Sequence, residues 1–430
     1  MMANIQFLVN NLWVAIAALL VFTMTISVGI LEVGELGERM NRSLLKTTMI
    51  MGSALVVMAV IGFNTAFAPT IDGIIGDPFY MPGLMLGAFS TAANSVNFIN
   101  GIWWSMLPQY FGTGLSATTY FLFETAFASV TLALVGVVVL RKMKLSSFFL
   151  FSIIYFVIIW NLPAAWIWNP TGWLYLMGMR DFAGGLVVHG AAGVAGIAIL
   201  VRIWQEERKA GLKTSMQEQI KLNEGWLVLA ILLLVMGWFG FNPGSVLAFN
   251  SDVIMVAVAT FLAAGSAMLS TMGTKYLVSK EAPGILYAVN GILMGLIVIT
   301  PLAGFVEPGS AIVLGLLAGP IFIAGERYFS RFKWFTDPVG LLPGHFLGGI
   351  FGVTMIAFFT ESAYAAASGN PTLPNGLLFG GGFAALHQLG IEVFGIAVVL
   401  ITVFVISYIT ITAISHLTNG LLTDCAKKGN

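Results

Sequence analysis

The chain has 430 residues, of which 58% are hydrophobic and only 9% are charged, whereas about a quarter of a typical soluble domain is charged. This composition excludes an ordinary cytosolic enzyme, and the balance of 19 basic against 19 acidic side chains excludes the basic surface that binds nucleic acid. With Cys425 as its single cysteine, the chain can form neither an internal disulfide nor a cysteine metal site, and we expect no metal or cofactor.

Eleven apolar stretches follow one another along the chain. Each is long enough to cross the hydrocarbon core of a bilayer as a helix, which takes about 20 residues, and too long for a strand of a membrane barrel. The sequence therefore predicts an all-α polytopic membrane protein. The expected spans lie near residues 10–31, 47–68, 114–140, 146–168, 181–203, 226–249, 253–277, 284–301, 309–329, 338–360 and 390–415.

Basic residues lie almost entirely on one side of these spans. With the N-terminus outside, the inner segments hold 18 of the 19 Lys and Arg residues, and only Arg180 is outside. Because cytoplasmic loops are enriched in basic residues, we expect an N-out, C-in orientation in the cell membrane. The first stretch has no basic leader, so we interpret it as a retained helix rather than a signal peptide. The inner segments are 32–46, 141–145, 202–225, 275–283, 327–337 and the tail from 416.

One spacing occurs twice. The pattern D-x7-H-x3-G-x2-G begins at Asp181 and again at Asp337, on the fifth and tenth spans. Because five spans separate the copies, they cross the membrane in opposite directions, as in an inverted repeat. The single membrane domain then divides into a first repeat (1–203), a second repeat (226–360), an eleventh helix (390–415) and a short cytoplasmic tail (416–430).

The two histidines of this pattern, His189 and His345, are the first candidate functional residues. Polar side chains at this depth are costly and usually line a path. The glycines that follow lie on the same helical face, so two helices can approach there and bring the imidazoles together. A helix-packing contact is the alternative. His387 and His416, near the two ends of the eleventh span, are expected at the surface.

Two carboxylates precede these histidines. Asp181 begins the fifth span, where backbone N–H groups and the helix dipole stabilise a carboxylate. We weigh this structural role above a functional one, in which Asp181 creates a negative potential where a cation enters. Asp337 is followed by Pro338 and is expected to cap the tenth span with proline at the first helical position.

Four segments carry a more specific pattern. They are DFAGGLVVHGAAGVAG (Asp181–Gly196), GWFGFNPGS (Gly237–Ser245), F-x3-FA within Phe123–Ala128 and DPVGLLPGHFLGGIFG (Asp337–Gly352). Together they resemble the ammonium transporter and ammonia channel family, in its microbial and plant branch rather than its Rhesus branch. The resemblance covers essentially the whole chain.

The resemblance implies a homotrimer with one narrow path per subunit, which takes ammonium, or methylammonium as its analogue. It also implies an outer ammonium site, a stacked phenylalanine gate and a hydrogen-bonded pair of histidines. In this sequence the outer site corresponds to Trp168, Ser245 and Phe127. The gate corresponds to Phe127 and Phe241, with Phe123 one turn before Phe127. The histidine pair corresponds to His189 and His345, and the essential aspartate of the family corresponds to Asp181.

Several positions depart from the family pattern. Glu124 and Glu392 stand where the family has glutamine, Pro243 replaces an alanine, and Gly344 and Phe346 flank the second histidine. Unlike glutamine, Glu124 can hold or pass a proton, or raise the affinity for a cation. The alternative for Glu124 is a protonated, hydrogen-bonded packing residue.

The implied mechanism depends on one chemical difference. Ammonium resembles potassium in charge and size, but it has N–H donors and a proton that can be removed. Deprotonation at the gate avoids the cost of a charge in an apolar path. Each neutral histidine has one donor and one acceptor nitrogen, so the pair can form hydrogen bonds with ammonia and can also pass on a proton. We expect electrogenic transport, with the passage of neutral ammonia as the alternative.

Two other functions stay open at this point. A sensor or receptor that binds ammonium but transports little is suggested by the bulky Phe346 and by the short tail after Thr418. This short tail also makes a PII-class signal protein doubtful as a partner. A membrane haem protein would use His189 and His345 as axial ligands, which leaves the aromatic residues without a role. No nucleophile–base arrangement supports an enzyme.

Overall fold

The computed structural model describes residues 2–37, 39–79, 114–138, 142–212, 222–332, 337 and 340–427. Within these ranges it contains eleven helical segments that are long and apolar enough to cross a membrane, as the sequence predicts. Some residues of the charge pattern lie outside the described residues, as does most of the loop 69–113. They are Arg141, Lys213, Lys221, Lys333 and Lys428.

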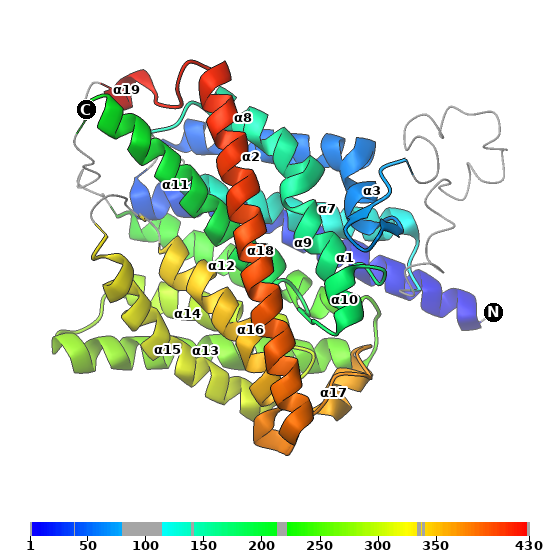
Figure 1. The fold of residues 1–430 in the computed structure, drawn as a ribbon. Coiled ribbons are helices and arrows are strands. Elements are labelled where there is room, and N and C mark those ends of the chain that lie inside the picture. Colours follow the sequence, from blue (N-terminus) through cyan, green and yellow to red (C-terminus); the bar gives the residue numbers. More distant parts are fainter. Residues whose placement is uncertain are drawn as a thin grey trace.

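Helices form nearly all of the described structure (Figure 1). The first five spans are α1 (Met2–Leu36); α2 (Met40–Val57) with η1 (Met58–Gly62) and α3 (Phe63–Phe67); α7 (Ala117–Val137); α8 (Leu145–Ile154) with η3 (Tyr155–Ile159) and α9 (Asn161–Ile167); and η4 (Gly185–Gly190) with α11 (Ala191–Lys209). The other six are α12 (Glu224–Phe241) with η5 (Pro243–Val246); α13 (Ser251–Ser279); α14 (Ile285–Ile299) with η6 (Thr300–Leu302); α15 (Pro308–Phe329); η7 (Leu341–Phe346) with α16 (Leu347–Phe359); and α18 (Gly382–Leu417). Short elements lie between them: β1 (Thr70–Ile71), β2 (Ile75–Gly76), α10 (Trp173–Met177), α17 (Ser362–Ala367), η8 (Leu377–Phe379) and α19 (Asp424–Lys427).

Several helix ends differ from the sequence prediction. The first and last spans, α1 and α18, are longer than the apolar stretches 10–31 and 390–415, because a helix that satisfies its own backbone hydrogen bonds can continue beyond the hydrocarbon core. The sixth span is shorter. Its α-helix ends at Phe241, because Pro243 cannot continue an α-helix and instead starts the 3₁₀ turn η5.

The first apolar stretch is packed inside the bundle. Helix α1 lies along α12 and α7, and glycines on α12 permit the close approach. A Cβ atom at Gly240 would lie 2.5 Å from the carbonyl oxygen of Ala17, and a Cβ atom at Gly237 would lie 2.1 Å from Cγ of Met24. Small residues at such contacts are typical of helices that pack within a membrane.

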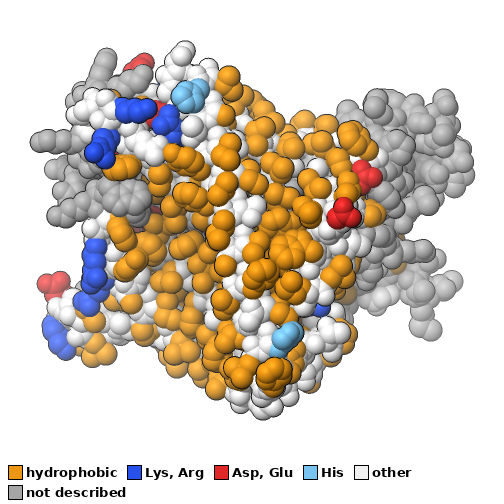
Figure 2. All heavy atoms as spheres, in the orientation of Figure 1, with side chains coloured by type: hydrophobic (Ala, Val, Ile, Leu, Met, Phe, Trp, Pro, Cys, Tyr) orange, Lys and Arg blue, Asp and Glu red, His pale blue; other side chains and the backbone are white. Residues whose placement is uncertain are grey.

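The two ends of the bundle differ in charge. The N-terminus and the C-terminus lie at opposite ends (Figure 1), and Lys and Arg side chains gather at the end where the C-terminus lies (Figure 2). Apolar side chains cover the face between the two ends in this view. This arrangement agrees with a membrane protein, while the N-out, C-in orientation stays a prediction.

The fifth and tenth spans begin in the same unusual way. Each starts with a π-helical turn, η4 or η7, and each turn follows a glycine in the left-handed conformation, Gly184 with φ +110° and Gly340 with φ +66°. Single π-helical turns inside helices occur frequently at functional sites. The two copies of the repeated pattern therefore share backbone conformation as well as spacing, and the boundaries of the full repeats stay a prediction.

Candidate functional site

The histidine pair lies where the two π-helical turns meet. The Nδ1 atoms of His189 and His345 are 3.0 Å apart, within hydrogen-bond distance, and both side chains are buried. Since one Nδ1 must donate and the other accept, one Nε2 is a donor and the other an acceptor. The Nε2 atom of His189 is buried and has no hydrogen-bond partner in the described structure, so it is available to a small polar molecule.

Glycines allow the two turns to come this close. A Cβ atom at Gly349 would lie 2.2 Å from the carbonyl oxygen of Gly185, and a Cβ atom at Gly193 would lie 2.5 Å from Cβ of Phe346. The expected role of the glycines beside the histidines is therefore confirmed. The bulk of Phe346 fits over Gly193, where any larger residue would collide with it.

Asp181 holds the turn that carries the first histidine. Its Oδ1 atom accepts hydrogen bonds from the backbone N–H groups of Gly184 and Gly185, at 2.9 and 2.7 Å. Its Oδ2 atom accepts from Leu186 and Val187, at 2.8 and 2.9 Å. The buried carboxylate thus satisfies all four N–H groups that start the helix, which confirms the structural interpretation.

Asp337 plays a similar part for the second turn. Its two carboxylate oxygens accept from the backbone N–H groups of Leu341 and Leu342, at 2.9 and 2.7 Å. The helix begins at Leu341, so the prediction that Asp337 directly precedes the helix was wrong. Its carboxylate reaches the first turn from four residues away because Gly340 bends the chain with positive φ. Pro338 lies outside the described residues.

The two phenylalanine rings of the predicted gate lie against each other beside the histidine pair. The ring centroids of Phe127 and Phe241 are 4.3 Å apart, and these side chains are 1% and 0% exposed. Phe123 lies against the first of them at 4.8 Å. The ring of His189 stacks on Phe241 at 5.7 Å with an interplanar angle of 16°, so the two phenylalanine rings and the histidine pair form one continuous column.

The residues of the predicted outer site adjoin these phenylalanines. The ring of Trp168 meets Phe127 edge-on at 5.7 Å, and its Nε1 atom donates a hydrogen bond to the backbone oxygen of Asp181 at 2.7 Å. The hydroxyl of Ser245 donates to the backbone oxygen of Phe241 at 2.8 Å. Because this bond uses the hydroxyl proton, the lone pairs of Ser245 stay available as acceptors for a cation.

The two glutamates that depart from the family pattern are both buried. Glu124 precedes Phe127 by three residues on α7, has the Tyr120 hydroxyl as a hydrogen-bond partner, and has one carboxylate oxygen, Oε2, without a partner in the described structure. Glu392 accepts hydrogen bonds from the backbone N–H of Arg180 at 3.1 Å and from Nε2 of Gln388 at 2.7 Å. Glu392 thus ties the eleventh span to the segment that leads into the fifth.

One aromatic residue of the site was missed from the sequence. The ring of Trp238 stacks on His189 at 5.6 Å with an interplanar angle of 20°, and its Nε1 atom donates to the hydroxyl of Thr300. Its position three residues before Phe241 on α12 places it on the same helical face. That spacing was the signal that could have found it.

The remaining predicted positions fall outside this column. His387 and His416 are exposed, as expected. Gly344 is buried, yet a Cβ atom there would meet nothing within 4 Å, so space is left beside His345. The direct contact between His189 and His345 excludes the haem alternative, because an iron and its porphyrin would have to lie between the rings.

Comparisons with known proteins agree with this geometry. The family model described as "Ammonium Transporter Family" matches residues 12–426. The chain is 27% identical to an ammonium transporter of Bacillus subtilis over 94% of this chain and 92% of that protein. It is 30% identical to an ammonium transporter of Aquifex aeolicus over 88% and 82%, respectively.

Solved structures share the fold. A structure described as "Sensor Amt Protein" superimposes with a TM-score of 0.80 at 23% identity, over 99% of this chain and 98% of that chain. The eleven candidate membrane spans and this structural similarity both indicate a helical membrane fold. The chain therefore belongs to the ammonium transporter family, and it is a multi-pass protein of the cell membrane rather than an enzyme.

Proposed function

We propose that the protein carries ammonium by taking up NH4⁺ at the outer site, removing a proton at the phenylalanine gate and passing NH3 along the histidine pair. One observation carries this proposal. The 3.0 Å contact between His189 and His345 lies directly behind a closed pair of aromatic rings. Such an arrangement suits a small neutral molecule that can exchange hydrogen bonds with imidazole.

The outer site supplies weak recruitment. The face of Trp168 offers cation–π attraction of about 0.5–2 kcal/mol, and Ser245 offers an acceptor oxygen for one N–H of the ion. This is enough to concentrate NH4⁺ near Phe127. It is too little to replace the hydration shell of a potassium ion, which has no hydrogen-bond donor to offer the serine.

The gate favours the loss of a proton. A charge at the centre of a membrane helix costs about 2.5–3.5 kcal/mol on insertion scales, and the buried hydrocarbon rings of Phe127 and Phe241 themselves offer no hydrogen-bond acceptor to offset it. When NH4⁺ loses a proton, the electron pair of the N–H bond stays on nitrogen and neutral NH3 can continue. Potassium cannot follow this route.

The proton travels separately in this proposal, so that each cycle moves charge. Glu124 is a candidate to hold or pass that proton, or to raise the affinity for the cation. Its position three residues before Phe127 and its unpaired Oε2 atom support this role. Below the gate, the Nε2 atoms of His189 and His345 offer one donor and one acceptor to ammonia and to the relayed proton.

Uptake of radiolabelled methylammonium by cells that lack other ammonium transporters tests the proposal. We expect saturable uptake that excess potassium does not inhibit and that falls at least tenfold in Phe241→Ala or His189→Ala. An alternative function is ammonium sensing with little transport, since a protein described as a sensor has the same fold. Wild-type protein that binds ammonium but shows no uptake would favour the sensor.

The family resemblance also leads us to propose a homotrimer with one path per subunit. The exposed apolar side chains on α1, α13 and α15 supply surface for such contacts. Native mass spectrometry of the purified protein would give the number of chains directly.

A further inference from the structure

The C-terminal end of α1 carries two buried glutamates three residues apart, Glu32 and Glu35, which are 0% and 5% exposed. Because α1 starts at the N-terminus, both lie toward the opposite end of the bundle, where Lys and Arg side chains gather (Figure 2). A buried carboxylate is costly unless a charge or hydrogen bonds compensate it. The partners of each glutamate therefore indicate what it does.

Glu32 is well compensated. Its Oε1 atom forms an ion pair with the ammonium group of Lys46 on α2, and its Oε2 atom accepts a hydrogen bond from the hydroxyl of Ser43 at 2.8 Å. Lys46 also donates to the backbone oxygen of Gly136 on α7 at 2.8 Å. This network joins α1, α2 and α7, so Glu32 has a structural role.

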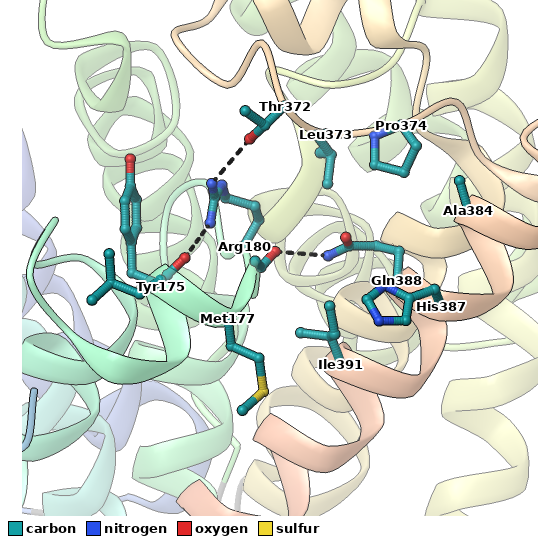
Figure 3. Close-up of a pocket in the computed structure, with 12 residues that line it drawn as sticks. Tyr175, Met177, Arg180, Thr372, Leu373, Pro374, Ala384, His387, Gln388 and Ile391 are labelled. Atoms are coloured by element: carbon teal, nitrogen blue, oxygen red, sulfur yellow. Dashed lines mark hydrogen bonds between the residues drawn. The ribbon is translucent and has the colours of Figure 1, made fainter.

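Glu35 differs from its neighbour. Its side chain forms no hydrogen bond and no ion pair within the residues that the structure describes. By contrast, the partly buried charge at the other end of the bundle, Arg180, donates to the backbone oxygen of Tyr175 and to the hydroxyl of Thr372 (Figure 3). Arg180 also interacts with Glu392. Glu35 is thus a buried carboxyl group that the protein leaves without a donor.

A second carboxyl group lies near Glu35. Asp337 is close enough for its charge to act on that of Glu35. Asp337 accepts hydrogen bonds from the backbone N–H groups of Leu341 and Leu342, the first residues of the turn η7 that carries His345. Glu35 therefore lies about one helical turn from the inner side of the second histidine.

The other elements packed around Glu35 leave it uncompensated. On α12, the backbone N–H of Asn223 donates to the backbone oxygen of Gly34 at 2.7 Å, which fixes the end of α1 through neutral groups. On α2, Lys46 is bound to Glu32 and to the backbone of α7. The charge that acts on Glu35 is therefore that of Asp337.

Two carboxyl groups this close share one proton more readily than they carry two charges. The negative charge is better placed on Asp337, because two backbone N–H groups bond to it. The proton is better placed on Glu35, which has no donor to stabilise a charge. The inner end of the second histidine's turn is thus next to a carboxyl group that can give up a proton.

We propose that Glu35 returns a proton to ammonia at the inner end of the path. This inference rests on the proposed function, because it needs neutral NH3 to arrive past His345. The O–H bond of the Glu35 carboxyl group breaks with its electron pair left on oxygen, and the lone pair of NH3 forms the new N–H bond. The carboxylates of Glu35 and Asp337 then attract the NH4⁺ until water takes it away. The proton relayed along the histidines restores Glu35.

Labelling with dicyclohexylcarbodiimide tests whether Glu35 holds a proton, and it does not require transport. This reagent modifies protonated carboxyl groups in apolar surroundings, and mass spectrometry of peptides locates the label. In the purified full chain in detergent at pH 7, we expect label on Glu35 and none on Glu32, which is paired with Lys46. Ammonium should slow the labelling several-fold, and potassium should not. Absence of label on Glu35, or label on both glutamates alike, would overturn the proposal.

The ammonium current of proteoliposomes tests the role of Glu35 in transport. We expect Glu35→Gln to lower the maximal current at least tenfold and to change its dependence on pH, since glutamine cannot exchange a proton. The ammonium concentration at half-maximal current should stay the same, because the outer site is intact. Glu35→Asp keeps a carboxyl group and should recover part of the current. A merely structural role would not produce this split.

Glu32→Gln is the matched control on the same helix. It leaves Lys46 without its counter-charge, so thermal melting should show a loss of stability, while the pH dependence of the current stays that of the wild type. A Glu35→Gln protein with the current and pH dependence of the wild type would overturn this proposal and leave the proposed function intact. A wild-type protein with uptake but no current would overturn both, because the proton would not travel separately.

Discussion

The carboxylate of Asp181 accepts four backbone N–H groups, whereas that of Asp337 accepts two. An asparagine at either position keeps one oxygen and loses the charge. We therefore expect Asp181→Asn to lower the free energy of unfolding by about 2–3 kcal/mol, with loss of transport, and Asp337→Asn to cost about half as much. Thermal melting in detergent and methylammonium uptake measure both effects. Equal losses in the two variants would contradict this difference.

Glu124 makes a second prediction at the residue scale. If its carboxyl group holds a proton or attracts the cation, Glu124→Gln should weaken ammonium affinity several-fold and change the dependence of uptake on pH, because glutamine cannot titrate. Uptake measured between pH 5 and 8, at several ammonium concentrations, gives both quantities. A variant with unchanged affinity and pH dependence would leave Glu124 as a packing residue.

The sequence analysis found some of these residues and missed others, for physical reasons. His189, His345 and Asp181 were found because they repeat at a fixed spacing in an apolar environment. Trp238 was missed because a tryptophan on a membrane helix is common and only the fold brings it onto His189. The bond between Glu392 and the backbone of Arg180 joins positions 212 residues apart, and no local pattern reports such a contact.

At the scale of elements, the positions of the helices were predicted well and their local geometry was not. Apolar length predicts a span, but a π-helical turn differs from an α-helical one only in the register of its hydrogen bonds. The sequence held one clue, since a glycine stands five residues before each histidine, and both Gly184 and Gly340 adopt the positive φ that precedes the turn.

The contact between the two turns makes a prediction for α16. A Cβ atom at Gly349 would lie 2.2 Å from the backbone oxygen of Gly185, and backbone cannot move aside cheaply. We expect Gly349→Ala to separate the histidines, with a loss of about 1–3 kcal/mol in stability and a loss of transport. Gly390→Ala on α18 is the control, because its Cβ would meet nothing within 4 Å. Normal transport by Gly349→Ala would contradict the close packing.

For the whole molecule, the distribution of basic residues predicts that the C-terminus faces the cytoplasm. In a Cys425→Ser background, Asp424→Cys should react with a membrane-impermeant maleimide only after the cells are opened. Thr372→Cys, exposed at the opposite end, should react in intact cells. The reverse labelling pattern would show that the orientation is the opposite of the predicted one.

The eleven spans could be predicted from the length of the apolar stretches. The trimer was predicted only from the family resemblance, because a single chain shows no subunit contact.

The most direct test of deprotonation at the gate is the current through proteoliposomes on a solid-supported membrane, with pulses of ammonium or potassium at equal ionic strength. We predict a current with ammonium, none with potassium, and at least a tenfold smaller ammonium current in His189→Ala, while His416→Ala, which changes an exposed histidine, behaves as wild type. A potassium current as large as that of ammonium, or intact ammonium uptake without any current, would contradict the proposed separation of ammonia and proton.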